Sequence, residues 1–160
     1  MPAGIDEDVG IEEPVKLVKE LSKRKARAAD SEDACKIGAD TVVTLDGRIY
    51  GKPHCEERAK SMLHELSGKW HTVYTGVTVI FRGREYTFAA RSKVLFKRLS
   101  AQDIDKYVAR VRPFDKAGAY GIQDNEVVSK YRGSYSNIVG LPLEKLVKVL
   151  KRAGVINGNG

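Results

Sequence analysis

Residues 37–53 read IGADTVVTLDGRIYGKP, and this stretch combines a strand signal with an unexpected carboxylate. The run at about 36–45 is rich in apolar and β-branched residues, which predicts a strand. Asp46-Gly47 is the preferred pair for a two-residue hairpin turn, so we expect residues 48–50 to form the returning strand. Asp40 interrupts the first strand, and Lys52 follows the second. From these residues alone, a structural carboxylate at a sheet end and a catalytic carboxylate are equally good interpretations of Asp40.

Helical and β patterns alternate on both sides of this stretch. Apolar spacing predicts a helix from Pro14 to about Ala29 and another over residues 59–66. The β-rich runs 70–81 and 84–96 are separated by only two residues, which predicts a second, longer hairpin.

The C-terminal third continues the alternation. Ser100 with Asp103 has the spacing of a capping box and predicts the start of a helix that stops before Pro113. Residues 127–131 and 136–140 are predicted to be short strands.

A last helix is expected between Pro142 and Gly154. Its apolar positions, expected to face inward, are Leu143, Leu146, Val147 and Leu150. We therefore predict an α/β fold with a mixed twisted sheet flanked by helices, because the hairpins supply antiparallel pairs and helical crossovers allow parallel ones. Residues 1–154 are expected to form a single domain, and residues 155–160 a flexible tail.

The composition is that of a globular protein that favours anionic partners. The chain has 160 residues and a net charge of +7, but its basic residues are spread over several helices among apolar positions. We therefore rank nucleic acid last among the partner classes. Neither a membrane-spanning run nor a signal peptide is visible, and the two cysteines lack the spacing of a zinc site. These features predict a cytoplasmic protein with no membrane partner.

Polar groups that local structure does not require occur at five places: Asp6-Glu7, Lys25, Asp40, Lys52 and Gln123. Carboxylates that hold Mg²⁺, together with lysines at phosphate oxygens, are suited to phosphoryl chemistry in which one carboxylate activates a water. Each residue alone also has a structural interpretation, such as a surface lysine, a terminal charge cluster or a turn amide.

Several blocks, in their order along the chain, resemble the Maf nucleotide pyrophosphatases. These blocks are GIDE at 4–7, LSKRKA at 21–26, IGADTVV at 37–43, DGRIYGKP at 46–53, MLHELSGKWHTVYTGV at 62–77, DKAGAYGIQ at 115–123 and GSYSNIVGLPL at 133–143. The resemblance implies an inosine-triphosphatase-like fold. It also implies hydrolysis of nucleoside triphosphates to monophosphate and pyrophosphate, as in house-cleaning of nucleotide pools.

The resemblance assigns a role to each candidate residue. Asp40 corresponds to the catalytic proton acceptor and, with Glu7, to a site for Mg²⁺, with Mn²⁺ as the alternative ion. Lys25 and Lys52 correspond to lysines at the triphosphate. Gln123 corresponds to an amide at the base and, with Thr41, indicates the subgroup that acts on dTTP and UTP; 7-methyl-GTP is the alternative substrate.

The family's N-terminal strand and its Ser-x-Ser-Pro-Arg-Arg loop have no counterpart in this sequence. We therefore expect an N-terminally truncated form of the fold. A nucleotide-binding protein with weak or no catalysis is the alternative function, because arginine makes bidentate phosphate contacts that lysine does not reproduce. The resemblance further implies a homodimer.

Overall fold

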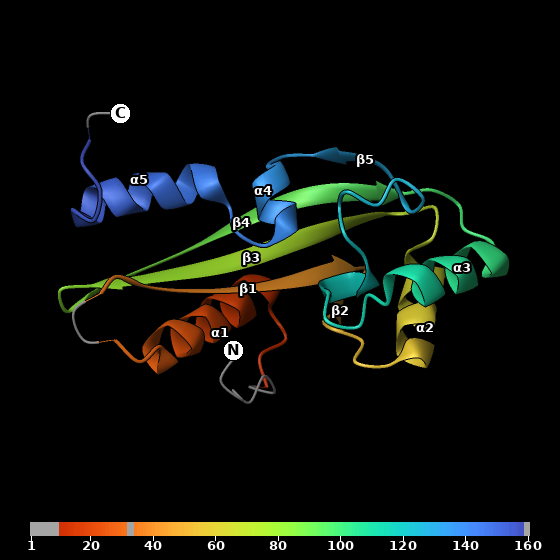
Figure 1. The fold of residues 1–160 in the computed structure, drawn as a ribbon, viewed down its shortest axis with the longest axis horizontal. Coiled ribbons are helices and arrows are strands. Elements are labelled where there is room, and N and C mark those ends of the chain that lie inside the picture. The colour runs from red at the N-terminus through yellow and green to blue at the C-terminus, as the bar shows by residue number, and fades with distance from the viewer. Residues whose placement is uncertain (1–9, 32–33, 159–160) are drawn as a thin grey trace. The chain divides into compact units, whose positions relative to one another are not determined.

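The structure is a computed structural model that describes residues 10–31 and 34–158 (Figure 1). Its elements, in chain order, are α1 (Pro14–Ala28), β1 (Lys36–Leu45), β2 (Arg48–Tyr50), α2 (Glu56–Leu66), β3 (Trp70–Phe81), β4 (Arg84–Phe96), α3 (Ala101–Val111), the 3₁₀ turn η1 (Ala117–Ala119), β5 (Val128–Arg132), α4 (Tyr135–Val139) and α5 (Leu143–Ala153). Helices and strands alternate, which confirms the α/β prediction.

The five strands form one sheet in the order β2-β1-β3-β4-β5. β1 pairs antiparallel with β2, with Val43 opposite Tyr50, and β4 pairs antiparallel with β5, with Lys93 opposite Arg132. Figure 1 shows β3 running opposite to both β1 and β4. The sheet is thus antiparallel, which corrects the prediction of a mixed sheet. The crossover through α2 does join two parallel strands, β2 and β3, but β1 lies between them.

The chain divides into two compact units. Unit 1 comprises the described residues of Met1–Thr41, Tyr74–Ala90 and Ser136–Gly160, and unit 2 comprises Val42–Val73 and Arg91–Tyr135. The strands β1, β3 and β4 each contribute residues to both units. The predicted boundaries, a single domain over 1–154 and a flexible tail over 155–160, stay predictions.

In unit 1, α1 and α5 cover opposite faces of the sheet (Figure 1). Glu13 caps α1, because its carboxylate oxygens accept from the backbone N–H groups of Val15 and Lys16 at 3.0 and 2.9 Å. On the α5 side, Leu146 packs against Val77 and Val79 of β3, and all three are buried. The sheet is therefore apolar on its α5 side at this point.

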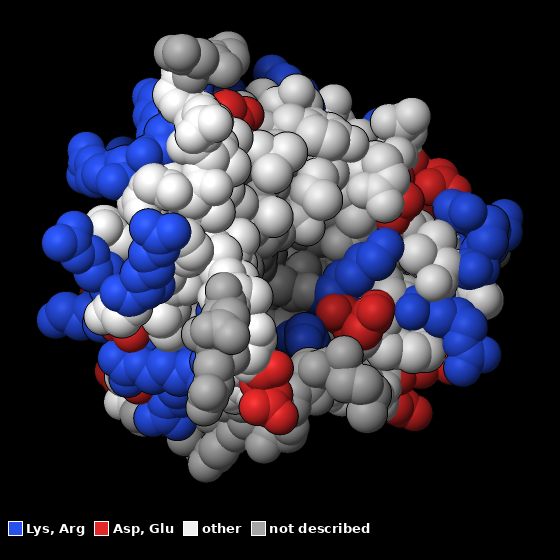
Figure 2. Space-filling view, turned by 60° about the vertical axis from the view of Figure 1, so that its left-hand side comes forward, with Lys and Arg blue, Asp and Glu red and all other residues white. Residues whose placement is uncertain are grey.

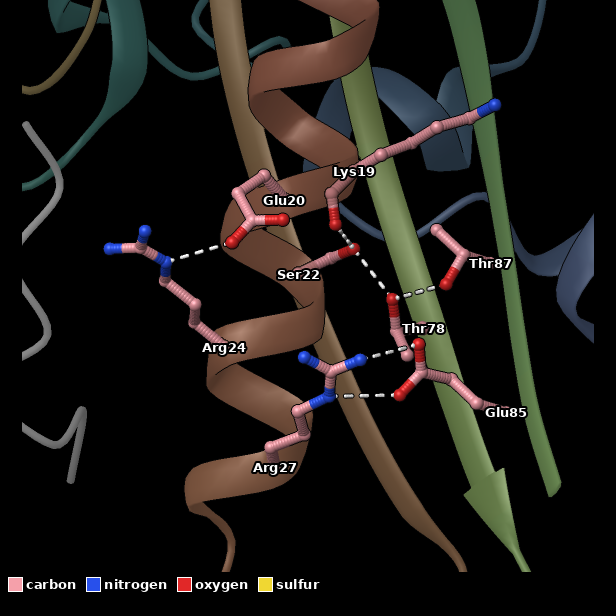
Figure 3. Close-up of polar contacts among 8 residues, drawn as sticks. All are labelled: Lys19, Glu20, Ser22, Arg24, Arg27, Thr78, Glu85 and Thr87. Atoms are coloured by element: carbon pink, nitrogen blue, oxygen red, sulfur yellow. Dashed lines mark hydrogen bonds and ion pairs between the residues drawn. The ribbon is translucent and has the colours of Figure 1, made fainter. Parts of the chain in front are cut away.

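On the sheet face away from α5, polar groups join α1 to β3 and β4, as Figure 3 shows. The Ser22 hydroxyl donates to the Lys19 carbonyl at 2.8 Å and lies 2.8 Å from the Thr78 hydroxyl, which lies 2.9 Å from that of Thr87. Because each hydroxyl has one proton, Thr87 donates to Thr78 and Thr78 donates to Ser22. This chain of hydroxyls satisfies the buried polar groups beneath the helix.

Unit 2 has its own core around α2 and α3. Buried side chains from α2, α3 and the strand segments of this unit include Leu63, Leu66, Val94, Phe96 and Val108. The predicted capping box at the start of α3 is confirmed, since Ser100 and Asp103 each accept from the other's backbone N–H.

Two local predictions in the C-terminal third are wrong. Residues 136–140 were expected to form a strand, but they lie in and directly after helix α4. The Ser136 hydroxyl accepts from the Leu143 N–H and donates to Glu144, which links α4 to the start of α5. In α5, Leu146 is buried as predicted, whereas Leu143 and Val147 are 52% and 41% exposed. The strand residues that pack against α5 therefore cover only part of its apolar face.

Candidate active site

Asp40 and Lys25 lie together in unit 1. Asp40 lies in the middle of β1 and Lys25 in the last turn of α1, and the Lys25 Nζ forms an ion pair with Asp40 Oδ1. The Asp40 side chain is 8% exposed and the Lys25 side chain 18%. A carboxylate so far from water requires a compensating charge, and the ammonium of Lys25 supplies one. The structure thus brings two of the predicted site residues into direct contact.

Gly38 explains how α1 comes close enough to make this ion pair. It precedes Asp40 by two positions on β1 and therefore faces the same side of the sheet. A Cβ atom on Gly38 would lie 2.2 Å from the Ser22 carbonyl oxygen and 2.4 Å from the Ala26 nitrogen. Gly76 on β3 has a similar position, because a Cβ there would lie 2.2 Å from the Val18 carbonyl oxygen. The helix backbone therefore rests directly on two glycines.

Thr41, the next residue after Asp40, does not take part in the ion pair but in a chain of hydrogen bonds with Thr75 and Asn137. The Thr75 hydroxyl donates to the Asn137 carbonyl at 3.0 Å and lies 2.8 Å from the Thr41 hydroxyl. Since the proton of Thr75 is already used, Thr41 donates to Thr75 and keeps only acceptor capacity for other groups. A ligand hydroxyl or N–H can donate to Thr41, but a phosphate oxygen gains nothing from it.

Lys52 lies in unit 2, in a loop that the backbone holds on both sides. The carbonyl of Gly51 accepts from the Gly118 N–H at 3.1 Å, and the N–H of His54 donates to the Phe114 carbonyl at 3.1 Å. His54 has a φ of 63°, a left-handed conformation that a side chain adopts only where its surroundings require it. Lys52 itself is half-buried. Its position is therefore set by backbone contacts with residues 114–118.

Gln123 lies in unit 2 on a turn that Asp124 stabilises. The Asp124 carboxylate accepts from the Gly121 N–H at 3.1 Å and from the Tyr107 hydroxyl at 2.6 Å. The Gln123 carboxamide lies close over Gly121, since a Cβ there would be 3.0 Å from both its nitrogen and its oxygen. Gly121 thus leaves room for the amide, and Tyr107 of α3 anchors the turn that carries it.

The predicted site residues therefore fall into two groups. Unit 1 holds Lys25, Asp40 and Thr41, and unit 2 holds Lys52 and Gln123. Glu7 lies outside the described residues. The structure brings Lys25 and Asp40 together, and it fixes the local surroundings of the other three residues.

Comparison with known proteins decides the family. A family model described as "Maf-like protein" matches residues 1–153. The chain belongs to the Maf-like proteins. This confirms the resemblance drawn from the sequence blocks.

Relatives of this Maf-like protein have a common name. A protein of Thermosipho africanus named "dTTP/UTP pyrophosphatase" is 44% identical over 161 residues, which cover 99% of this chain and 84% of the relative. A Bacillus cereus protein of the same name is 44% identical over 153 residues, covering 92% and 80% of the two chains. A third, from Thermosipho melanesiensis, is 45% identical over 148 residues, covering 91% and 81%.

The expected Mg²⁺ can be tested against the donors of this Maf-like protein. Within residues 10–31 and 34–158, no three His, Cys, Asp or Glu side chains form a group that could hold a metal ion. Mg²⁺ does not need such a group, because it commonly binds one or two carboxylates together with substrate phosphates and waters. Asp40 is the one predicted metal ligand among the described residues, and one carboxylate is compatible with that mode of binding, so the Mg²⁺ site stays a prediction.

Sequence reasoning missed the residues that position the site. Gly38 and Gly76 bring α1 onto the sheet, Thr75 holds Thr41, and Tyr107 with Asp124 holds the turn of Gln123. A glycine inside a strand pattern is a known sign of close backbone approach, so the two glycines carried a usable signal. Thr75 and Tyr107 gave no signal in the sequence, because threonine is common in strands and tyrosine is common in helices.

Proposed function

We propose that this chain hydrolyses dTTP and UTP to the nucleoside monophosphate and pyrophosphate. The observation that carries the proposal is the buried Asp40–Lys25 ion pair in a chain whose relatives, at 44% identity over nearly its whole length, are named dTTP/UTP pyrophosphatase. A buried carboxylate beside a lysine suits a reaction that must remove a proton from water near a polyanion.

In the proposed reaction, water attacks the α phosphorus atom, which the bridging oxygen joins to the β phosphate. A P–O bond to the water oxygen forms, the bridging P–O bond breaks, and pyrophosphate leaves. Asp40 accepts the proton of the attacking water. Lys25 and Lys52 act as cations for phosphate oxygens, and Gln123 pairs with the base through its carboxamide.

A divalent cation belongs to the same proposal. Asp40 and Glu7 are the carboxylates that would hold Mg²⁺, with Mn²⁺ as the alternative. When bound, such an ion neutralises phosphate charge. Chelation with EDTA should abolish turnover, and added Mg²⁺ should restore it; full activity after exhaustive chelation would contradict this part of the proposal.

The predicted cytoplasmic location is part of the same proposal. In the part of the chain that the structure describes, no helix is both long and apolar enough to span a membrane.

The deciding assay incubates the protein with dTTP or UTP and identifies the products by ³¹P NMR. Monophosphate and pyrophosphate in equal amounts are expected. Nucleoside diphosphate with inorganic phosphate would overturn the proposal, as would faster turnover of 7-methyl-GTP than of either pyrimidine substrate. Nucleotide binding without turnover would favour the alternative of a non-catalytic nucleotide-binding protein.

A further inference from the structure

The strand β5 forms one edge of the sheet and leaves its outer side open. It is the last strand in the order β2-β1-β3-β4-β5, and it pairs with β4 (Figure 1). Residues 129–132 are all exposed, and among the described residues their backbone groups bond only to β4. In an antiparallel pair, alternate residues turn their N–H and C=O groups away from the partner strand. These outward groups of β5 can therefore bind a further strand.

Cations of β4 and β5 gather on one face of this edge. Lys93 lies directly opposite Arg132, and Lys130 precedes Arg132 by two positions, so the three side chains face the same side of the sheet. All are exposed, and within the described part of the chain none of them forms an ion pair with an acidic side chain. Like charges directly opposite each other destabilise a strand pair, so this arrangement favours a bound anionic group.

Trp70 of β3 holds two of these cations in place. The Cζ atom of Arg132 lies 5.2 Å from the centre of the Trp70 ring, and the Nζ atom of Lys130 lies 5.8 Å from it. At these distances a cation is attracted to the face of an indole ring. The two cations are therefore partly ordered before a ligand binds, which lowers the entropy cost of binding.

Tyr131 presents an aromatic surface on the other face of β5. It lies between Lys130 and Arg132 in the strand, so its side chain points to the opposite side of the sheet. The Tyr131 side chain is 44% exposed. A strand added to β5 would thus meet cations on one face and an aromatic ring on the other. Such a strand needs acidic residues at alternate positions with apolar residues between them.

We propose that the outer edge of β5 binds an extended acidic segment of another protein as an additional strand of the sheet. Carboxylates at alternate positions pair with Lys130 and Arg132, and the apolar residue between them contacts Tyr131. A second copy of this chain is a poor occupant, because pairing of two β5 edges would set the cations of one copy against those of the other. This inference does not depend on the proposed hydrolysis.

The fluorescence of Trp70 measures this binding directly. Trp70 is the single tryptophan of the chain, and its ring lies beside Lys130 and Arg132. Titration of the full-length protein with a blocked peptide of about six residues, alternating glutamate and valine, should change the fluorescence saturably. The same peptide with lysine in place of glutamate should cause no change. Added salt should weaken binding of the acidic peptide, because the ion pairs are exposed.

Charge reversal on β5 distinguishes this edge from general attraction to a basic protein. Lys130→Glu combined with Arg132→Glu should weaken binding of a fluorescein-labelled acidic peptide about tenfold, measured by anisotropy. Lys148→Glu combined with Arg152→Glu is the matched control, because it makes the same change in net charge at exposed positions of α5. Equal loss of binding in the two double variants would overturn the inference.

Methylation of the peptide backbone tests the strand pairing itself. In an added strand only every second N–H faces β5, so N-methyl groups at one set of alternate positions should abolish binding. At the other set they should leave the affinity within about twofold of the unmethylated peptide. Equal affinity of the two methylated peptides would contradict strand addition, because attraction between charges does not distinguish them. Absence of saturable binding by the unmethylated acidic peptide would also overturn the inference.

Discussion

Asp40 is a charged residue buried in the middle of a strand. Its side chain is almost fully buried in the middle of β1, and the ammonium of Lys25 lies against it. A buried ion pair contributes little net stability compared with apolar residues of similar size. The position of this carboxylate at the centre of a strand is therefore better explained by the proton-accepting role that we propose than by folding.

Replacement of Asp40 by asparagine tests that role. Asp40→Asn keeps the shape of the side chain but removes the proton acceptor, so kcat for dTTP should fall by about 10²–10⁴-fold. Asp46→Asn is the matched control, because Asp46 lies in the turn after the same strand with a φ of 50°, which asparagine tolerates. A kcat for Asp40→Asn within about threefold of that of Asp46→Asn would remove Asp40 from the mechanism.

Tyr107 provides a second test at the scale of one residue. Burial, together with the hydrogen bond to Asp124, raises the pKa of Tyr107, so its hydroxyl stays protonated and donates to that carboxylate. Tyr107→Phe should lower the free energy of unfolding by about 1.5–3 kcal/mol, the range for a hydrogen bond to a charged group. Urea denaturation measures this loss. An unchanged urea midpoint would mean that the hydrogen bond from Tyr107 to Asp124 does not stabilise the fold.

The helix α1 is the element whose placement decides the contact between Lys25 and Asp40. Its backbone rests on Gly38 and Gly76, while hydroxyl groups and the Arg27–Glu85 ion pair, at 3.0 Å, join it to β3 and β4 (Figure 3). Glycine is needed at these two strand positions because any side chain would collide with helix backbone, which cannot move aside as a side-chain tip can. Lys25 reaches Asp40 only because the helix lies this close.

Gly38→Ala should therefore displace α1. The added methyl group would lie 2.2 Å from a backbone oxygen, so we expect a loss of about 3 kcal/mol or more in the free energy of unfolding, together with a fall in activity. Gly51→Ala is the control for stability, because nothing lies within 4 Å of its added carbon. Thermal denaturation of both variants makes the comparison. Equal stability of the two would contradict direct contact between α1 and β1.

At the scale of the whole molecule, Figure 2 shows how the charged side chains are distributed over one face. On the face drawn in Figure 2, Lys and Arg side chains lie in several groups with acidic side chains among them. For that face, this distribution agrees with basic residues on solvated helix faces. Nucleic acid therefore stays, as a prediction, the last of the partner classes.

The stability of the fold should depend on pH through His71. This ring is buried against Phe96 and Tyr120, its Nε2 lies 2.8 Å from the Tyr120 hydroxyl, and burial lowers the pKa of His71 from 6.5 to about 4. Between these two values the unfolded chain binds a proton that the folded protein does not. The part of the free energy of unfolding that depends on a neutral His71 is therefore fully present above pH 6.5. It falls by about 3 kcal/mol in total as the pH falls towards 4.

Denaturation in urea between pH 7 and pH 4 measures this dependence. His71→Phe should reduce the loss of stability over this range, whereas His64→Gln should leave it unchanged, because His64 is exposed. If the free energy of unfolding falls with pH equally steeply in both variants, carboxylates and not His71 cause the acid sensitivity of the fold.

The sequence by itself determined the features that depend on neighbouring residues. The strand at Lys36–Leu45, the Asp46-Gly47 hairpin and the capping box of α3 were predictable because turn geometry and capping are decided within a few residues. The ordered motif blocks also sufficed for the family and for the names of the candidate residues. The N-terminal truncation and the homodimer stay predictions.

Only the tertiary structure decided the features that join distant segments. The order of the strands placed β1 between β2 and β3 and so made the sheet antiparallel. Residues 136–139 lie in helix α4, where the Ser136 hydroxyl accepts from the Leu143 N–H at the start of α5. The contact of Lys25 with Asp40, across 15 positions, depends on a helix lying on a glycine of another element. Such contacts follow from the close packing of whole elements, which no local pattern of residues encodes.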